Sequence, residues 1–226
     1  MLGWSEELSH IMLRMTDMVM VLAPIAVFGS IMGSLAHSGI GMLMQFGRFL
    51  VEFYSTLLAP WIVLTALAFC VLGPRLKPLL KKLVQPGLLG FSTASSESAY
   101  PLLLEKLEES GVPGRIASFV LPLGYSFNLD GSIMFQSFGA IFIAQAYGIH
   151  LPWSQQILMV LVMMLSSKGI AGVPRASLVT LVAVLPQFGL PESGTALILG
   201  IDHFLDMART ATNVLGNGYA AAVSAK

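Results

Sequence analysis

Charged residues are scarce in this sequence. Only 11% of the 226 residues are Asp, Glu, Lys or Arg, while 55% are apolar and the mean hydropathy is +0.79. An ordinary soluble domain carries about 25% charged residues, so this chain has too few to cover a globular surface with water-facing groups. The formal net charge is zero, which gives no sign of a basic nucleic-acid-binding face. The composition therefore indicates a membrane protein without a nucleic-acid partner.

Cysteine is also almost absent. The single Cys70 lies in the apolar run WIVLTALAFCVLG, so it has no partner for an internal disulfide and is expected to act as a small apolar residue. The first ten residues, MLGWSEELSH, carry two acids where a signal peptide would have a basic region. We therefore expect no cleavable signal, and we expect the apolar segments to insert by themselves.

Three apolar segments are long enough to cross a membrane, which takes about 20 residues. They are residues 11–35, 49–72 and 194–223. After the second segment comes the basic run RLKPLLKK at residues 75–82. Basic residues concentrate in cytoplasmic loops, so this run predicts a loop on the cytoplasmic side.

Three further segments are apolar but interrupted. In residues 83–110 two short halves flank STASSES, and in residues 155–189 two short halves flank SSKGIAGVPRAS. Because neither half can cross alone, each pair predicts a re-entrant hairpin. In residues 116–147 the interruption is NLDGS. The pattern predicts an all-α membrane protein with two re-entrant helical hairpins and a broken helix, which points to a secondary transporter with a binding site near the bilayer midplane.

The last apolar segment carries a stripe of polar residues. Asp202, Asp206, Arg209, Asn213 and Asn217 are spaced 4, 3, 4 and 4 residues apart, which places them on one face of a helix. A charge at the bilayer centre costs about 2.5–3.5 kcal/mol, so this stripe should face a polar interior. A simpler alternative is an intrahelical ion pair of Asp206 with Arg209 that only neutralises itself.

The stripe has the chemistry to hold an acidic amino acid. The planar guanidinium of Arg209 suits a carboxylate, because it can donate two parallel charge-assisted hydrogen bonds. Asp206, one turn away, could hold an ammonium group. The backbone N–H groups at the hairpin tips could receive a second carboxylate of the same substrate.

The interruption NLDGS (128–132) has the chemistry to hold a cation. An unwound helix frees backbone carbonyls, and the carboxylate of Asp130 adds an anionic oxygen. Asn128 and Asn213 are the expected amide partners. The alternative is a plain kink in which Asp130 pairs with Lys168.

Four motifs resemble one known family. SSES (95–98), PLGYSFNLDGS (122–132), SSKGIAGVP (166–174) and LGIDHFLDMARTATNVLGN (199–217) occur in the order found in the dicarboxylate/amino acid:cation symporters, the glutamate transporter family. The resemblance covers essentially the whole chain. It implies a symporter rather than an enzyme, with no catalytic residue and no cofactor besides the coupling ion, which would be H⁺ and/or Na⁺.

The resemblance also implies the roles of individual residues. Asp206 would take the substrate amino group and Arg209 its side-chain carboxylate. The other implied substrate contacts are Ser96, Ser132, the backbone of Val173, Thr210 and Asn213. The implied cation ligands are Gly124, Ser126, Asn128, Asp130, Ser167, Asn213 and Asn217.

The implied architecture is a transport core with inverted repeats that moves like an elevator against a trimeric scaffold. The second hairpin would be the extracellular gate, and the location would be the bacterial inner membrane, crossed several times. Residues 1–74 would supply part of the scaffold and the start of the transport domain. The core would comprise residues 75–226, with a hairpin at 78–110, a broken helix at 115–147, a hairpin at 155–189 and the last helix at 192–224.

Two departures from the family pattern bear on coupling. Asn217 stands where sodium-coupled members carry an acid, so coupling to protons or to fewer sodium ions becomes plausible. The family's chains are about twice this length, so this sequence corresponds to the C-terminal part. It would lack the first four spans, which include most of the trimerising scaffold and a helix that lends ligands to one cation site.

Three rival functions remain open from the sequence. A carrier of C4-dicarboxylates such as succinate, fumarate or malate would resemble this chain, but Asp206 would repel a substrate without an ammonium group. A membrane-embedded hydrolase would need a base such as His203 beside a serine, and the sequence has no HExxH motif. A pore could use Gly/Ser tips, but the Asp206 and Arg209 pair suits binding better than flow.

Overall fold

The computed structural model describes residues 41–169 and 176–226 continuously, together with a few single positions before residue 41. Within these residues the regular structure is entirely helical, without a strand. This agrees with the predicted all-α class. The predicted span at residues 11–35 lies almost wholly outside the described residues and stays a prediction.

Helix α3 (Gly41–Leu72) is the longest of the described elements, with 32 residues, and it begins before the predicted span at residues 49–72. At 1.5 Å per residue it measures about 48 Å, more than the ~30 Å hydrocarbon core of a bilayer. The stretch Phe46–Thr93, which continues from α3 into the next helix, is the one part of the described chain long and apolar enough to span a membrane. Its most apolar window has a mean hydropathy of 2.1.

The basic run at residues 75–82 is helical, so the prediction of a loop there is wrong. The chain turns at Gly73, whose φ of 60° favours glycine, passes the short 3-10 helix η1 (Gly73–Arg75) and enters α4 (Leu76–Thr93). In α4 the leucines at positions 76, 79 and 83 are buried, while the lysines at 77 and 81 are exposed. The leucines share one buried face of the helix and the lysines lie outside that face, so the segment forms an amphipathic helix.

Helices α4 and α5 (Ser96–Glu109) form a helical hairpin with a very short tip. Ala94 adopts a left-handed conformation, and Ser95 caps α5 by accepting a hydrogen bond from the backbone N–H of Ser98 at 3.3 Å. At the open end, Lys106 contacts Glu109 at 2.8 Å, and this hydrogen bond lowers the pKa of the Glu109 carboxyl. The polar tip predicted at residues 92–98 is therefore mostly helical.

The predicted broken helix is present. Helix α6 (Gly114–Phe127) ends where Asn128 and Leu129 leave helical geometry, and α7 (Asp130–Ala146) begins directly after them. The break is thus shorter than the motif NLDGS, since its last three residues form the first turn of α7.

The next segment has two short helices around a tip. Helix α8 (Trp153–Ser166) is followed by η2 (Ser167–Gly169), and α9 (Ala176–Val184) continues into η3 (Leu185–Phe188). Residues 170–175, between η2 and α9, lie outside the described part of the chain.

The last helix is also broken, which corrects the prediction of one continuous span at residues 194–223. After η4 (Glu192–Thr195) and the one-turn helix α10 (Ala196–Leu199), the helix is interrupted at Gly200 and Ile201, of which Ile201 leaves helical geometry, and α11 (Asp202–Ser224) begins. The hydroxyl of Tyr54 in α3 donates a hydrogen bond to the carbonyl of Phe204 at 2.8 Å. The side chain of Tyr54 therefore fixes the start of α11 beside α3.

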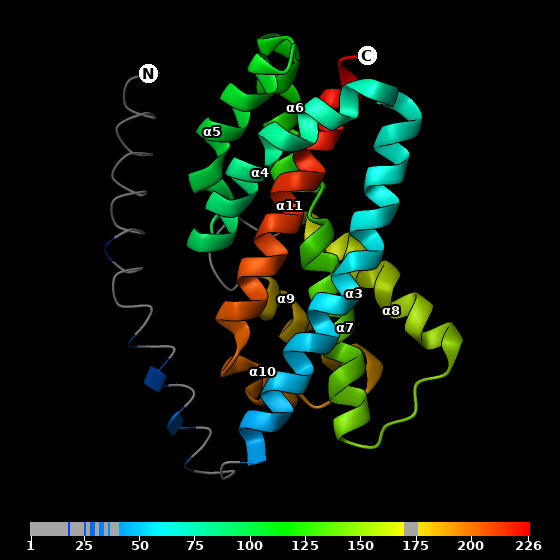
Figure 1. Ribbon diagram of the computed structural model, residues 1–226. Helices are drawn as coiled ribbons and strands as arrows, with labels where there is room; N and C mark the ends of the chain where they lie inside the picture. The colour runs from blue at the N-terminus through cyan, green and yellow to red at the C-terminus, as the bar shows by residue number, and fades with distance from the viewer. Residues whose placement is uncertain are drawn as a thin grey trace, which may run out of the picture.

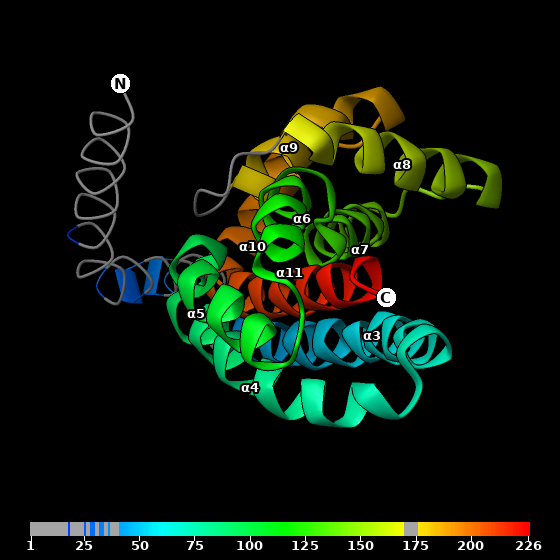
Figure 2. The ribbon, with the colours of Figure 1, turned by 90° about the horizontal axis from the view of Figure 1, so that it is seen from above.

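Helix α11 is the centre of the molecule. Figures 1 and 2 show it enclosed by α3, α4, α5, α6 and α7, while α8 and α9 pack beside α7. The packing forms two buried apolar clusters, one centred on Phe53, Phe135 and Leu181 and the other on Leu83, Leu103 and Leu121. Because α11 is enclosed, its polar stripe faces protein rather than lipid.

Candidate functional site

The polar stripe of α11 is buried among the surrounding helices. Asp206 is 5% exposed, Arg209 3% and Asn217 1%. Buried charges of this kind must be paired or hydrogen-bonded to be tolerated. The stripe therefore marks a polar interior, as its spacing predicted.

Arg209 and Asp206 form a buried ion pair within α11. The Nε and Nη2 atoms of Arg209 both contact Oδ1 of Asp206, at 3.0 and 2.6 Å. Thr210 donates a third hydrogen bond to the same oxygen at 3.3 Å. The guanidinium also lies 4.7 Å from the centre of the Phe135 ring, a cation–π contact.

The intrahelical pair leaves part of the guanidinium unused. The Nη1 atom of Arg209 is buried and has no hydrogen-bond partner within the described residues. A buried donor without a partner is costly, and a carboxylate is the acceptor that a guanidinium binds best. The pair with Asp206 thus fixes the guanidinium in place while the N–H groups of Nη1 stay available to a ligand.

Asn213 links α11 to the first turn of α7. Its Oδ1 accepts a hydrogen bond from the backbone N–H of Gly131 at 2.8 Å, and its Nδ2 donates to the hydroxyl of Ser132 at 3.2 Å. A Cβ on Gly131 would overlap the backbone carbonyl of Arg209. Only glycine therefore allows α7 to approach α11 this closely.

A second set of oxygens meets α11 one turn further along. Asn128 at the break donates to Oδ1 of Asn217 at 3.2 Å. Gly124 packs so tightly against Asn217 that a Cβ there would overlap its Oδ1. The Oδ2 atom of Asp130 faces Gly216, is buried, and has no hydrogen-bond partner in the described part of the chain.

These oxygens are suited to a hard cation. Carboxylate, amide and carbonyl oxygens are the ligands that such cations prefer, and an unwound helix supplies the carbonyls. Among the described residues Lys168 forms no ion pair with Asp130 within 4 Å, and its ammonium bonds instead to the carbonyl of Phe127. The simple kink with an Asp130–Lys168 pair is therefore not what the structure contains.

The remaining predicted site residues lie at various distances from this cluster. Ser96 is buried at the start of α5, and the neighbouring α4 helix reaches the stripe where Gly90 packs beside Thr210. Ser167 is fully buried, but its hydroxyl donates to the carbonyl of Met164. Ser126 is exposed on α6. The predicted contact at Val173 falls outside the described residues.

One polar residue near the site was missed by the sequence analysis. Gln136 in α7 is fully buried, its Nε2 donates to the carbonyl of Ser177 at 3.3 Å, and its Oε1 has no partner among the described residues. It joins α7 to the start of α9. The signal for it was a single amide in the apolar run IMFQSFGAIF.

Rival chemistries find little support in this part of the structure. Across the described residues, no group of three or more His, Cys, Asp or Glu side chains could hold a metal ion. The His203 ring meets the Phe204 ring edge to face, with 6.2 Å between the ring centres. That position gives no support to a serine hydrolase.

Comparison with known proteins identifies the family. The model of the sodium:dicarboxylate symporter family matches residues 1–226. The chain is 43% identical over 225 residues to the proton/sodium-glutamate symport protein of Geobacillus stearothermophilus, covering 100% of this chain and 53% of that protein. It is 45% identical over 221 residues to the proton/glutamate-aspartate symporter of Escherichia coli, covering 98% and 51%.

A C4-dicarboxylate transport protein of Erwinia tasmaniensis is also similar, at 40% identity over 222 residues, covering 98% of this chain and 52% of that protein. The chain thus spans about half the length of these curated relatives, all of which are named as transport proteins. The match over the full chain, together with the buried stripe and the broken helix, shows that the chain belongs to the sodium:dicarboxylate symporter family.

Proposed function

We propose that the chain forms the substrate- and cation-binding core of a secondary symporter that takes up glutamate or aspartate together with H⁺ and/or Na⁺. The observation that carries the proposal is the buried arrangement of Asp206 and Arg209 beside the α6–α7 break. An acidic amino acid offers an ammonium for the carboxylate and a carboxylate for the guanidinium. The names of the relatives at 43% and 45% identity support this substrate class.

Cation binding at the break would supply the coupling. Asn128, Asp130, the carbonyl of Gly124 and the amides of Asn213 and Asn217 provide the oxygens. Asn213 connects the two halves of the site, since it contacts the start of α7 and lies one turn from Arg209. A cation that orders this region would therefore also order the substrate stripe.

The architecture proposed for the full protein follows the family resemblance. The α4–α5 hairpin and the α8–α9 segment would be re-entrant, with their tips at the substrate. Transport would proceed by an elevator motion within a homotrimer in the bacterial inner membrane. The short tip at Ala94 and Ser95, and the placement of α4 beside Thr210, support this arrangement.

The second candidate substrate is a C4-dicarboxylate, favoured by the name of the relative at 40% identity. Such a substrate offers no ammonium group to Asp206. It would bring another carboxylate close to the buried Asp206 carboxylate, which like-charge repulsion disfavours. The ammonium group of glutamate or aspartate meets no such repulsion, which favours an amino acid as the substrate.

Substrate counterflow in liposomes tests the proposal. Vesicles containing the purified chain and loaded with unlabelled glutamate should accumulate labelled glutamate, and external aspartate should compete. Binding of labelled substrate to the chain in detergent provides a readout that does not require transport. Binding of succinate without binding of glutamate or aspartate would establish the dicarboxylate carrier instead.

A further inference from the structure

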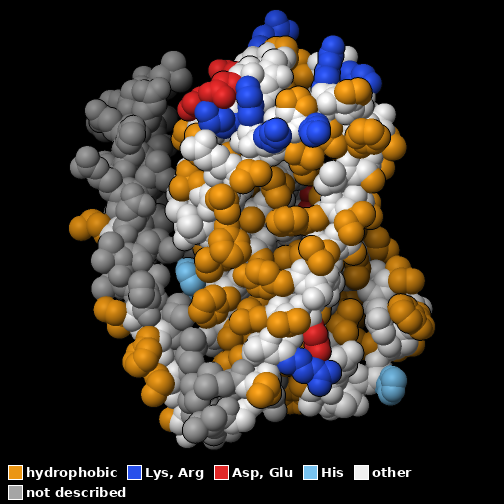
Figure 3. Space-filling view, in the orientation of Figure 1, with side chains coloured by type: hydrophobic (Ala, Val, Ile, Leu, Met, Phe, Trp, Pro, Cys, Tyr) orange, Lys and Arg blue, Asp and Glu red, His pale blue; other side chains and the backbone are white. Residues whose placement is uncertain are grey.

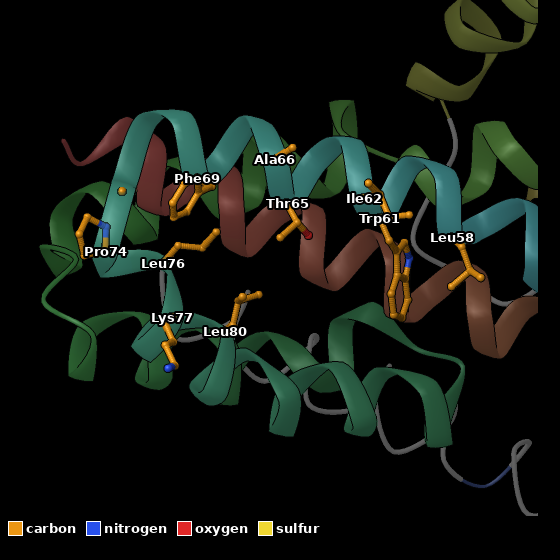
Figure 4. Close-up of a pocket in the computed structure, with 11 residues that line it drawn as sticks. Leu58, Trp61, Ile62, Thr65, Ala66, Phe69, Pro74, Leu76, Lys77 and Leu80 are labelled. Atoms are coloured by element: carbon orange, nitrogen blue, oxygen red, sulfur yellow. The ribbon is translucent and has the colours of Figure 1, made fainter.

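An apolar groove separates α3 from α4. Leu58, Ile62 and Phe69 line it from α3, and Leu76 and Leu80 line it from α4, around a volume of about 830 Å³ (Figure 4). This volume lies within the range of small-molecule sites, about 300–1,000 Å³. The groove lies apart from the substrate stripe and has no role in the function proposed above.

Two polar side chains in the groove wall already have partners. The indole N–H of Trp61 donates to the hydroxyl of Thr212 at 2.8 Å, and the hydroxyls of Thr65 and Tyr219 lie 3.2 Å apart. These bonds join α3 to α11 and use the donors that the groove would otherwise present. A ligand along the groove therefore meets an apolar surface and gains little from polar groups.

One end of the groove is cationic. Lys77 lines it beside the corner at Pro74, and no acidic residue lines it. Among the described residues Lys77 has no ion-pair partner, and Arg75 and Lys81 are exposed nearby on the same short stretch. Figure 3 shows basic side chains gathered at this end of the molecule above a predominantly apolar flank.

We propose that this groove binds an anionic phospholipid, with an acyl chain along α3 and α4 and the phosphate at Lys77. An amphiphile with a negative head group matches both the apolar length and the cationic end. Basic residues at the membrane surface attract anionic lipids. The apolar face that extends from this end would then lie among the acyl chains of the same leaflet.

The groove is long enough for an acyl chain, and its cationic end favours an anionic amphiphile over an apolar helix of the longer protein. From Leu58 to Gly73 the groove follows α3 for about 22 Å, more than the ~15 Å depth of one leaflet's hydrocarbon. An acyl chain is narrow enough to fit.

A bound acyl chain would also act on the substrate site. It would cover the Trp61–Thr212 hydrogen bond, and Thr212 directly precedes Asn213 in α11. Shielding this bond from competing groups strengthens it, because hydrogen bonds are stronger in a low dielectric. Lipid in the groove should therefore hold α3 against α11 behind the substrate stripe.

Native mass spectrometry of the purified chain tests the proposal. Palmitoyl-oleoyl phosphatidylglycerol should bind about fivefold more tightly than the phosphatidylcholine of the same chains, the effect expected of one well-placed lysine. Lys77→Gln should abolish this preference, whereas Lys81→Gln, which removes the same charge outside the groove, should keep it. A photoreactive phosphatidylglycerol should label the segment containing residues 58–80.

A groove-filling variant separates this site from general lipid contact. Ala66→Phe should weaken binding of both lipids, while Leu67→Phe, at a neighbouring exposed position outside the groove lining, should not. Circular dichroism on each variant confirms folding. Equal binding of both lipids, unchanged binding to Ala66→Phe, or displacement of the label by a co-expressed N-terminal half from a relative would each overturn the proposal.

Discussion

The proposed role of Asp206 as the ligand of the substrate ammonium can be tested by substitution. It holds the guanidinium of Arg209 and the hydroxyl of Thr210, and we assign it the ammonium of the substrate. Asp206→Ser should weaken glutamate binding by about 2–3 kcal/mol, roughly a hundredfold in Kd, because a buried charge partner is lost. Succinate has no ammonium and is repelled by the Asp206 carboxylate, so its affinity should not fall. Competition binding with both ligands measures the difference.

The control for this prediction is Asp206→Asn, which keeps the shape of the side chain and an acceptor for Arg209. If the ammonium matters, this variant should lose glutamate affinity and keep its fold. An equal loss of glutamate and succinate in both variants would mean that Asp206 serves only to position Arg209.

Asp130 tests the cation site. Asp130→Asn removes the anionic oxygen that faces Gly216, so we expect ion-stimulated substrate binding to disappear while Arg209 still holds a carboxylate weakly. Substrate affinity should be measured against sodium concentration and against pH. Glu192→Gln, an exposed acid far along the chain, serves as control. Wild-type dependence of Asp130→Asn on both ions would refute the cation site.

Asn217 tests which ion is coupled. Asn217→Asp places a second carboxylate where Asn128 now donates a hydrogen bond at 3.2 Å, and a buried carboxylate is costly unless a cation neutralises it. We expect the variant to gain sodium dependence in binding and to unfold at a lower temperature without sodium. Sodium chloride should restore the unfolding temperature of the variant, and N-methylglucamine chloride at equal ionic strength should not. If the substrate affinity of the parent protein does not depend on sodium and rises as the pH falls, the coupled ion is the proton.

The residues of the site could be found from the sequence, but their contacts could not. The 4, 3, 4, 4 spacing placed Asp206, Arg209 and Asn213 on one buried face because helix periodicity is local. The hydrogen bonds of Asn213 to Gly131 and Ser132 join residues about 80 positions apart. Only the packing of α7 on α11 determines them.

At the scale of elements, breaks were easier to recognise than boundaries. NLDGS combines a charge and a glycine in an apolar run, and the helix is indeed interrupted there. The break at Gly200 and Ile201 was missed although the charged Asp202 follows it directly, because residues 194–223 together form one apolar segment long enough to span a membrane. The helical nature of residues 75–82 was missed because the lysines suggested a loop, while the buried leucines between them form a helical face.

The contact of α7 with α11 depends on a glycine. Gly131→Ala should push the first turn of α7 away from the carbonyl of Arg209, costing about 1–3 kcal/mol as overpacking and weakening substrate and ion binding together. Gly47→Ala is the matched control, because no atom lies within 4 Å of its added Cβ and alanine favours a helix. Thermal unfolding in detergent measures both. Full stability of Gly131→Ala would show that the two helices are not held this closely.

At the scale of the whole molecule, the chain spans about half the length of its curated relatives. The described helices nevertheless enclose α11, bury the substrate stripe and partly bury the break. The substrate stripe and the break therefore assemble from segments within this chain. The partly buried carboxylate of Asp130 is where the site would bind a cation. That cation could be held by this chain alone or together with further protein ligands.

The proposed orientation of the two hairpins concerns the whole molecule in the membrane. If the two hairpins are re-entrant from opposite sides, a cysteine at position 96 should react with an impermeant maleimide from the cytoplasmic side and one at position 171 from the outside. The single native cysteine, Cys70, is exposed and must first be replaced by alanine. Substitutions Ser96→Cys and Ala171→Cys would be compared in intact cells and in inside-out vesicles. Opposite sidedness is expected because hairpins related by an inverted repeat enter from opposite faces, and labelling of both positions from one side would contradict the proposed topology.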